Sequence, residues 1–176
     1  MARGVGLIAI ALLGVLAHPI AAQRHLDQYD QIFRKYSKRY FGPGQDWRIF
    51  KAQGMTESRL DPKAVSFSGA RGLMQLMPST YAQIQSKQPD FASIDDPEWN
   101  IAAGILHDRS LWRLWADSVE AVDHQDFMFG SYNAGRGTVL RAQGVARTKG
   151  HDPRTWAGSV AIASDVPRWR HKETLE

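Results

Sequence analysis

The chain has 176 residues and a formal net charge of +4, with 43% hydrophobic and 23% charged residues. This length suits one domain with or without a leader, and the composition excludes a disordered chain or a protein with many membrane spans. The lack of cysteine excludes disulfides, cysteine-bound metals, thiol nucleophiles and a lipoprotein anchor. The mild positive charge suits an anionic partner such as nucleic acid, anionic lipid or cell-wall polymer.

The N-terminal segment, residues 1–22, is predicted to be a secretory signal peptide. Arg3 precedes an uncharged and mostly apolar run over residues 5–17, which Pro19 and small residues follow. This order is typical of a cleaved leader, and the run is shorter than the roughly 20 residues of a membrane span. Cleavage would leave residues 23–176 as an exported domain of the periplasm or cell envelope. A buried helix or an uncleaved anchor is the alternative.

The rest of the sequence predicts a mainly α-helical domain, because apolar residues recur at helical spacing and strand patterns are nearly absent. A first helix over residues 26–40 has one basic face and ends at the Gly-Pro-Gly sequence of residues 42–44. Asp46 can cap a second helix that extends to about Ser58. Residues 61–70 have the composition of turns.

The second half of the sequence is also predicted to be helical, with proline and glycine marking the element ends. In order, we expect a buried helical turn at 72–76, a helix opened by Pro78, a long helix over 97–115, helices over 123–134 and 136–145, and a short element around Trp156.

Glu57 is the first candidate for chemistry. It stands at the end of the second predicted helix, just before a polar turn, where its carboxyl group can face a cleft. Partial desolvation would raise the pKa of this carboxyl and keep it protonated as a general acid near neutral pH. The hydroxyl of Ser58 can orient groups in the same cleft. A glutamate on an exposed helix surface is the alternative.

The string GARGLMQLMPST at residues 69–80 places a polar amide in an apolar, glycine-rich turn. A buried Gln75 needs hydrogen-bond partners, which either a bound sugar or a backbone carbonyl can supply. Gly69 and Gly72 permit a tight backbone and the close approach of a ligand. Met74 is more often a core residue than a ligand contact.

Two further strings follow, Asn-Ile-Ala-Ala-Gly at residues 100–104 and Tyr-Asn-Ala-Gly at residues 132–135. The amphipathic ring of Tyr132 could reach the carboxyl group of Glu57. Asn133 stands at a helix end before a glycine, where its amide is expected to satisfy backbone groups.

In this order, the strings over about residues 47–140 resemble the catalytic domain of soluble lytic transglycosylases, a lysozyme-like family that cleaves peptidoglycan. The resemblance implies a lysozyme-like, goose-type-like helical domain with a substrate cleft. It also implies that Glu57 is the single catalytic acid and base. Peptidoglycan glycan strands would be the binding partner, and the domain is expected to be a monomer.

The resemblance assigns further roles around Glu57. Met74 and Gln75 would line the saccharide cleft with Ser58, and Tyr132 would orient the Glu57 carboxyl. The residues expected to brace the motif are Gly69, Gly72, Asn100 and Asn133.

Three features depart from the family pattern. Ser131 replaces an alanine, which is expected to have little consequence. His107 and Asp108 stand where the family often has Tyr-Leu, so that Asp108 must be paired or exposed, and local packing rather than chemistry is in question. The chain stops at residues 172–176, where the family continues into a Tyr-Val string. Either the chain is truncated or this part of the cleft is missing, which could reduce activity.

A single motif carboxylate favours a mechanism without the usual second acid. Asp61 is the nearest second candidate but is expected to build a turn, and Asp95 and Asp96 are expected to cap the long helix. By the resemblance, Glu57 protonates the bond between N-acetylmuramic acid and N-acetylglucosamine and then acts as base on the C6 hydroxyl. The product is a 1,6-anhydromuramoyl end, and no metal or cofactor is needed.

Other functions remain open. A hydrolytic muramidase would need a water site and a second acid, and a non-catalytic wall-binding module could serve envelope assembly or secretion machinery. Nucleic-acid binding is suggested by the basic first helix but is not expected, because the sequence has a leader and no recognition motif. The helical spacing of Trp112 and Trp115 places both in the core rather than in a sugar cleft.

Overall fold

The computed structural model describes residues 26–166, so the predicted signal peptide and residues 172–176 lie outside the described part of the chain. Within residues 26–166 there are helices, turns and two isolated bridges but no strand, which confirms the mainly α-helical class. The elements are α2 (Asp30–Phe41), α3 (Arg48–Ser58), α4 (Pro78–Gln85), α5 (Pro97–Trp115), η1 (Ala121–Asp123), α6 (His124–Ala134), α7 (Arg136–Thr148), α8 (Trp156–Val160) and η2 (Ala163–Asp165).

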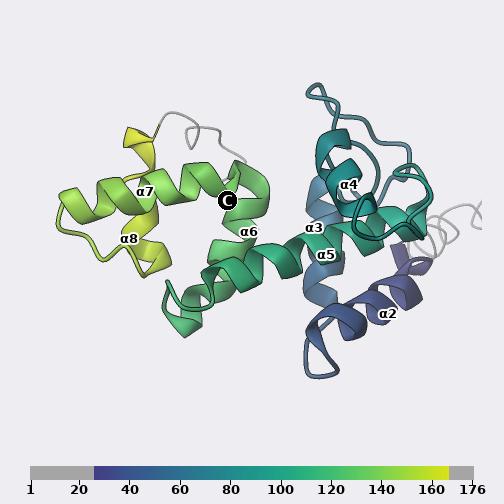
Figure 1. The fold of residues 1–176 in the computed structure, drawn as a ribbon, viewed down its shortest axis with the longest axis horizontal. Helices are drawn as coiled ribbons and strands as arrows, with labels where there is room; N and C mark the ends of the chain where they lie inside the picture. The colour runs from purple at the N-terminus through teal and green to yellow at the C-terminus, as the bar shows by residue number, and fades with distance from the viewer. Residues whose placement is uncertain (1–25, 167–176) are drawn as a thin grey trace, which may run out of the picture.

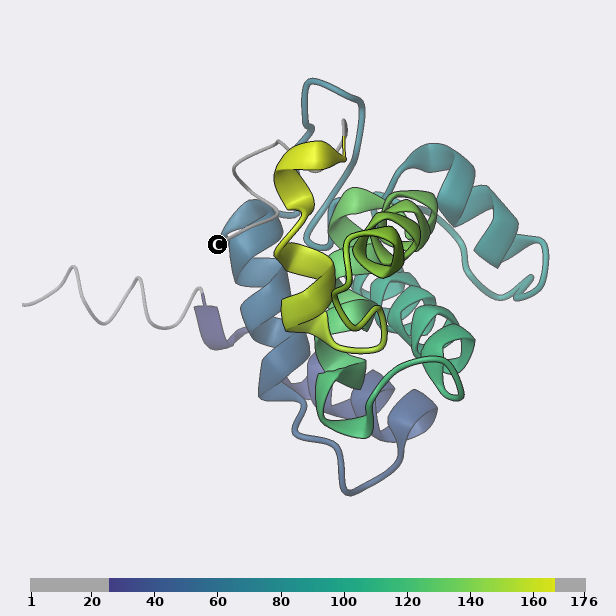
Figure 2. The ribbon, with the colours of Figure 1, turned by 90° about the vertical axis from the view of Figure 1, so that its left-hand side faces the viewer.

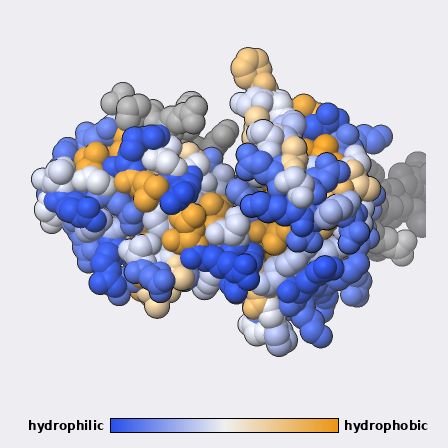
Figure 3. Space-filling view, in the orientation of Figure 1, coloured by the Kyte–Doolittle hydropathy of each residue, from blue (hydrophilic) through white to orange (hydrophobic). Residues whose placement is uncertain are grey.

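The helices form two groups that α5 and α6 connect (Figure 1). α2, α3 and α4 lie around the first part of α5, while α7 and α8 lie at the other end of the molecule. Figure 2 shows the molecule from the end that carries α7 and α8, so that one group lies in front of the other. The surface is notched between the groups in the space-filling view of Figure 3.

Each group has its own buried apolar cluster, and both long connecting helices contribute to each of them. α5 places Ile101 and Ile105 in the first cluster and Trp115 in the second. α6 places Met128 in the first cluster and its sequence neighbour Phe127 in the second. Because burial of apolar surface is the main stabilising term in folding, this sharing fixes the two groups relative to one another.

The start of α5 is the one that the sequence predicts. Pro97 occupies the first helical position, and Asp96 Oδ1 accepts hydrogen bonds from the backbone N–H groups of Glu98 (2.9 Å) and Trp99 (3.1 Å). The expectation that Asp95 also caps this helix is wrong. Asp95 stands one residue too early for the cap position and instead forms two hydrogen bonds with the guanidinium of Arg71, at 2.9 and 2.8 Å.

α7 is longer than predicted, since it ends at Thr148 rather than at residue 145. Gly144 lies inside the helix without stopping it, and the chain leaves the helix only before Gly150, which has a φ of 78°. A glycine ends a helix where its backbone adopts the left-handed region, and Gly144 does not.

Trp115 lies in the core, as predicted, with 1% of its surface exposed. Its indole Nε1 donates a hydrogen bond to Ser131 Oγ at 3.0 Å. Ser131 is therefore more than a neutral replacement of alanine, because its hydroxyl supplies the acceptor that a buried indole N–H requires. Trp112 is partly buried against the first cluster, and its ring stacks on His124 at 3.7 Å between centroids.

Ser131→Ala is expected to lower the free energy of unfolding by about 1–3 kcal/mol, because it leaves the buried indole N–H of Trp115 without an acceptor. Ser110→Ala, at an exposed position of α5, is the matched control and should change stability by less than about 0.5 kcal/mol. Urea denaturation monitored by tryptophan fluorescence measures both variants. Equal stabilities of the two variants would contradict the assignment.

Candidate active site

Glu57 is half-buried in the last turn of α3, in the wall of a cavity of about 420 Å³ between α3 and α6. The α3 residues that line the cavity recur three to four positions apart and so share one helix face. The lining residues are Ile49, Ala52, Gln53, Thr56 and Glu57 from α3, and Gln125, Phe129 and Asn133 from α6.

The chain turns sharply directly after Glu57, which fixes where the carboxyl group lies. Arg59 and Leu60 both have left-handed backbone angles, with φ of 56° and 60°. Such angles cost non-glycine residues roughly 1–2 kcal/mol each, and the fully buried side chain of Leu60 offsets this cost by packing in the core. Glu57 is thus held at the last turn before the chain reverses.

Ser58 connects α3 to the following turn. Its hydroxyl lies within hydrogen-bonding distance of two backbone carbonyls, that of Leu73 at 2.9 Å and that of Gly54 at 3.3 Å. A hydroxyl has one proton to donate, so its role in the structure is to hold the helix end against the turn. A contact between Ser58 and a substrate stays a prediction.

Residues 71–76 form a tight turn, which we name the central turn, and not the helical turn that the sequence predicts. Arg71 and Leu76 exchange two backbone hydrogen bonds, of 2.9 and 3.1 Å. Gln75 has a φ of 45°, outside the right-handed helical region. The expected burial is confirmed, because Leu73 and Leu76 lie in the core.

Asn100 holds the central turn from α5. It is 0% exposed. Its Oδ1 accepts from the backbone N–H of Met74 at 2.8 Å, and its Nδ2 donates to the carbonyls of Arg71 (3.0 Å) and Ile94 (2.8 Å). A buried amide that makes three hydrogen bonds in this way specifies one arrangement of the turn.

Gly72 and Gly69 are both required by the backbone, with φ of 75° and 85°. They differ in their surroundings. A Cβ at Gly72 would collide with the side-chain amide of Asn100, whereas nothing lies within 4 Å of a Cβ at Gly69. Gly72 is therefore the residue that lets Asn100 approach the turn.

The expectation that the Met74 side chain lines a saccharide cleft is wrong, because this side chain is 0% exposed. It packs against Gly104 of α5 and Gly54 of α3, two glycines that leave room for its thioether. What Met74 offers toward the site is its backbone carbonyl, which accepts the hydroxyl proton of Tyr132 at 2.7 Å.

Gln75 is half-buried, and its Nε2 donates to the backbone carbonyls of Gly72 (3.0 Å) and Ala64 (3.3 Å). Of the two alternatives that the sequence left open, the structure therefore shows the backbone-bonded amide. Binding of a sugar by Gln75 stays a prediction.

Tyr132 lies on α6, and its hydroxyl group donates to the Met74 carbonyl. The centroids of the Tyr132 and His107 rings are 5.2 Å apart. Burial, and secondly the charges of Asp108 and Glu57, raise the pKa of the Tyr132 phenol well above its usual value. Tyr132 is therefore a neutral group close to Glu57. Since its single proton goes to Met74, it can orient Glu57 only by accepting a hydrogen bond from the protonated carboxyl.

Asn133 is exposed and lies in the α6 wall of the cavity. Its expected role of satisfying backbone groups at the helix end stays a prediction. Sequence reasoning also missed Gln53 and Thr56 on α3 and Phe129 on α6. The signal that could have found the α3 residues is their spacing, since Gln53 precedes Glu57 by one helical turn.

Two further carboxyl groups near Glu57 have other surroundings. Asp61 is exposed and its Oδ1 accepts from the backbone N–H of Lys63 at 2.8 Å, which confirms that it builds a turn. Asp108 is 0% exposed. The expectation that Asp108 must be paired or exposed fails, because it is buried with a single hydrogen bond, from Gln53 Nε2 at 3.4 Å.

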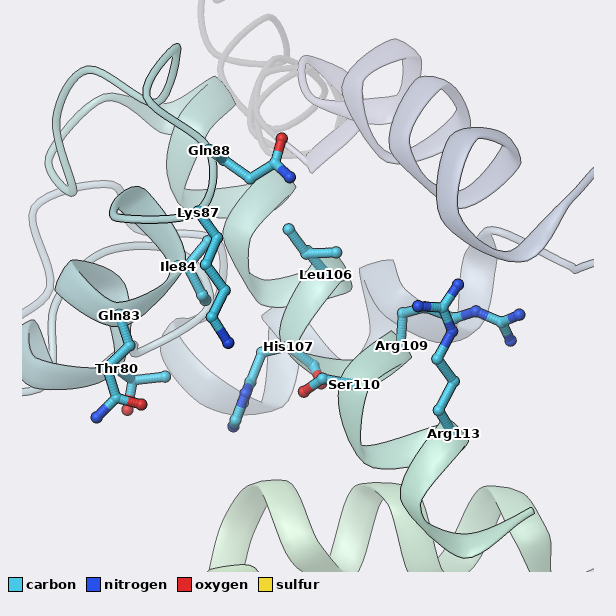
Figure 4. Close-up of a pocket in the computed structure, with 10 residues that line it drawn as sticks. All are labelled: Thr80, Gln83, Ile84, Lys87, Gln88, Leu106, His107, Arg109, Ser110 and Arg113. Carbon is cyan, nitrogen blue, oxygen red and sulfur yellow. The ribbon is translucent and has the colours of Figure 1, made fainter.

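A second cavity, of about 320 Å³, lies between α4 and α5 (Figure 4). Lys87, Arg109 and Arg113 contribute to its walls, and none of the residues that line it carries a carboxyl group. His107 reaches this cavity and also packs its ring against Tyr132. The His107 side chain therefore lies between the second cavity and the tyrosine beside Glu57.

The sequence and the fold agree with known proteins. Residues 32–154 match the family of transglycosylase SLT domains, and the chain belongs to this family. Its helices also superpose on the 70 kDa soluble lytic transglycosylase of Escherichia coli, with a TM-score of 0.56 and 25% identity over 88% of this chain and 24% of that one. The lysozyme-like helical fold implied by the sequence is thereby confirmed.

Relatives in the family are named membrane-bound lytic murein transglycosylase F. The protein of this name from Vibrio campbellii is 31% identical over 152 residues, which cover 86% of this chain and 26% of that protein. The one from Maricaulis maris is 35% identical over 133 residues, which cover 74% of this chain and 27% of that protein. The chain spans about a quarter of the length of these relatives.

Gly72→Ala is expected to destabilise the protein by about 3 kcal/mol or more, because it adds a clash with a buried amide to the strain of a positive φ. Gly69→Ala is the matched control, since it has the same kind of backbone and open space. It should cost only about 1–2 kcal/mol. Thermal unfolding of both variants measures the difference, and a larger loss for Gly69→Ala would contradict the role of Asn100.

Proposed function

We propose that the chain is a peptidoglycan lytic transglycosylase, which cleaves the β-1,4 bond between N-acetylmuramic acid and N-acetylglucosamine with Glu57 as acid and base. The observation that carries this proposal is the place of Glu57 in the wall of an open cavity between α3 and α6. Family membership and the names of the relatives support the same chemistry.

The reaction would use the Glu57 carboxyl twice. Its proton passes to the glycosidic oxygen as the bond from that oxygen to the muramic acid C1 breaks. The resulting carboxylate then takes the proton of the C6 hydroxyl, whose oxygen forms the new bond to C1. Glu57 ends protonated, the product carries a 1,6-anhydro ring, and no water is consumed.

The composition of the cavity wall suits a sugar. Thr56, Gln125 and Asn133 offer hydroxyl and amide groups, while Ile49 and Phe129 offer apolar surface. Saccharide and ligand sites commonly combine a few polar groups with apolar walls in this way. These residues, more than the buried Met74, are the ones that we expect to contact the glycan.

A hydrolytic muramidase is the second candidate, since it would act on the same bond. Inverting and retaining glycosidases need a second carboxylate beside the first. Among the residues that line the cavity, Glu57 alone carries a carboxyl group. The carboxyl group of Asp61 accepts a backbone hydrogen bond within a surface turn. Asp108 is completely buried and cannot reach a substrate. The arrangement therefore favours the transglycosylase.

We further infer that the protein acts outside the cytoplasm, in the periplasm or at the cell envelope. The signal-peptide pattern of residues 1–22 supports this, as do relatives whose name calls them membrane-bound. Over residues 26–166, no helix has the length and apolarity needed to cross a membrane. A monomer, and a role beside envelope assembly or secretion machinery, stay predictions.

Glu57→Gln is expected to reduce release of fragments from purified peptidoglycan by about 10²–10⁴-fold, because the amide cannot transfer a proton. Asp61→Asn, which changes a nearby exposed carboxyl group in the same way, should keep the wild-type rate. Mass spectrometry of the soluble fragments gives both the amount and the chemistry of the ends, with anhydro ends expected.

Other results of this experiment would identify the alternatives. Fragments with reducing ends that depend on Glu57 would establish the muramidase. Binding of the wild-type protein to peptidoglycan without any fragment would overturn the enzyme and favour the wall-binding module.

A further inference from the structure

Asp108 is a buried carboxyl group that the proposed reaction does not use. It lies in the middle of α5 and is 0% exposed. Its Oδ1 accepts from Gln53 Nε2 at 3.4 Å. Two buried oxygens, Asp108 Oδ2 and Gln53 Oε1, have no hydrogen-bond partner among the described residues. The two unsatisfied atoms thus belong to the same two side chains that already share one hydrogen bond.

A proton on Asp108 would give both oxygens a hydrogen bond, because Asp108 Oδ2 would donate it and Gln53 Oε1 would accept it. Burial raises the pKa of Asp108 well above its usual value, and the charge of Glu57 adds to this effect. The hydrogen bond from Gln53 acts in the opposite direction. The protonated acid has one donor and one acceptor side by side, and so does a primary amide. The two groups can therefore form two hydrogen bonds head to head, with the Asp108 hydroxyl donating to Gln53 Oε1.

Gln53 is the link from this pair to the reaction site. It lies one helical turn before Glu57 on α3 and lines the same cavity. A glutamine side chain without fixed partners samples several rotamers, and ordering it costs conformational entropy. A partner behind the helix would hold its amide in one orientation in the cavity wall.

We propose that Asp108 is a positioning residue of the Glu57 site, a neutral carboxylic acid that pairs head to head with the Gln53 amide and holds it in the cavity wall. The inference rests on the proposed function, because it takes the Glu57 cavity as the reaction site.

The groups around Asp108 define what its ionisation would do. Glu57 faces it from α3 and neutral Tyr132 from α6. Beside it on α5, burial lowers the pKa of His107, which is uncharged at neutral pH, and Arg109 follows in sequence. The turn after α4 places Lys87 at the second cavity.

Two side chains of α2 bond α5 at another place. Lys35 and Tyr36 bond Glu98 in the first turn of α5, about 15 Å along the helix from Asp108. Loss of the Asp108 proton would place a negative charge beside Glu57. It would also turn an oxygen lone pair toward Gln53 Oε1, which breaks the pair.

Asp108→Asn and Asp108→Leu test this proposal. Asparagine supplies the same donor and acceptor but cannot ionise, whereas leucine keeps the branched shape and removes both hydrogen bonds. We expect Asp108→Asn to release anhydro fragments within about twofold of the wild-type rate and Asp108→Leu to be about tenfold slower or worse. Gln53→Met removes the other partner of the pair and should slow fragment release to the same extent as Asp108→Leu. Wild-type rates in both Asp108→Leu and Gln53→Met would overturn the proposal.

Urea denaturation as a function of pH provides a readout that does not depend on catalysis. Because the pKa of Asp108 is higher in the folded than in the unfolded state, its stabilising contribution is complete at low pH and is lost as the pH rises through the folded value. The stability of Asp108→Asn relative to wild type should therefore increase over that range. In the Glu57→Gln background the range should move to lower pH, because the charge that raises the pKa is gone.

An equal pH dependence of wild type and Asp108→Asn would overturn the neutral pair, whatever the activity. If the wild type releases no fragments, the proposed function fails, and the denaturation experiment still decides whether the pair exists. The two failures are thus distinguishable.

Discussion

The three hydrogen bonds of the buried Asn100 amide are the constraint on which the rest of the site depends. They hold the central turn against α5. The turn in turn offers two backbone carbonyls to side chains from other helices, that of Leu73 to Ser58 and that of Met74 to Tyr132. α3, α5 and α6 therefore meet at one turn, and the position of Glu57 at the end of α3 follows from it.

Two buried groups near Glu57 have raised pKa values. Burial is the main cause for both the phenol of Tyr132 and the carboxyl of Asp108. The proposed reaction uses the Glu57 carboxyl first as an acid and then as a base, when the C6 hydroxyl gives up its proton.

The helices of this protein were largely predictable, because their ends depend on neighbouring residues. Pro97 with Asp96 and the glycine after α6 mark boundaries that the structure reproduces. The central turn was predicted with the wrong backbone, since its shape depends on Asn100, which is 26 residues from Met74 in sequence. The candidate site was predicted in part, with Glu57 in a cavity but Met74 on the wrong side of the turn.

The order of the helices, the Asp96 cap of α5 and the motif carboxylate at a helix end could be predicted from the sequence, because these properties arise from contacts over a few residues. Which side chains face the cavity depends on the tertiary packing of the helices. Asn133 is exposed there because α6 packs beside α3, and Met74 is buried because Gly54 and Gly104 make room for it. Asp108 is buried for the same reason, since burial depends on which helices meet and not on the residues next to it.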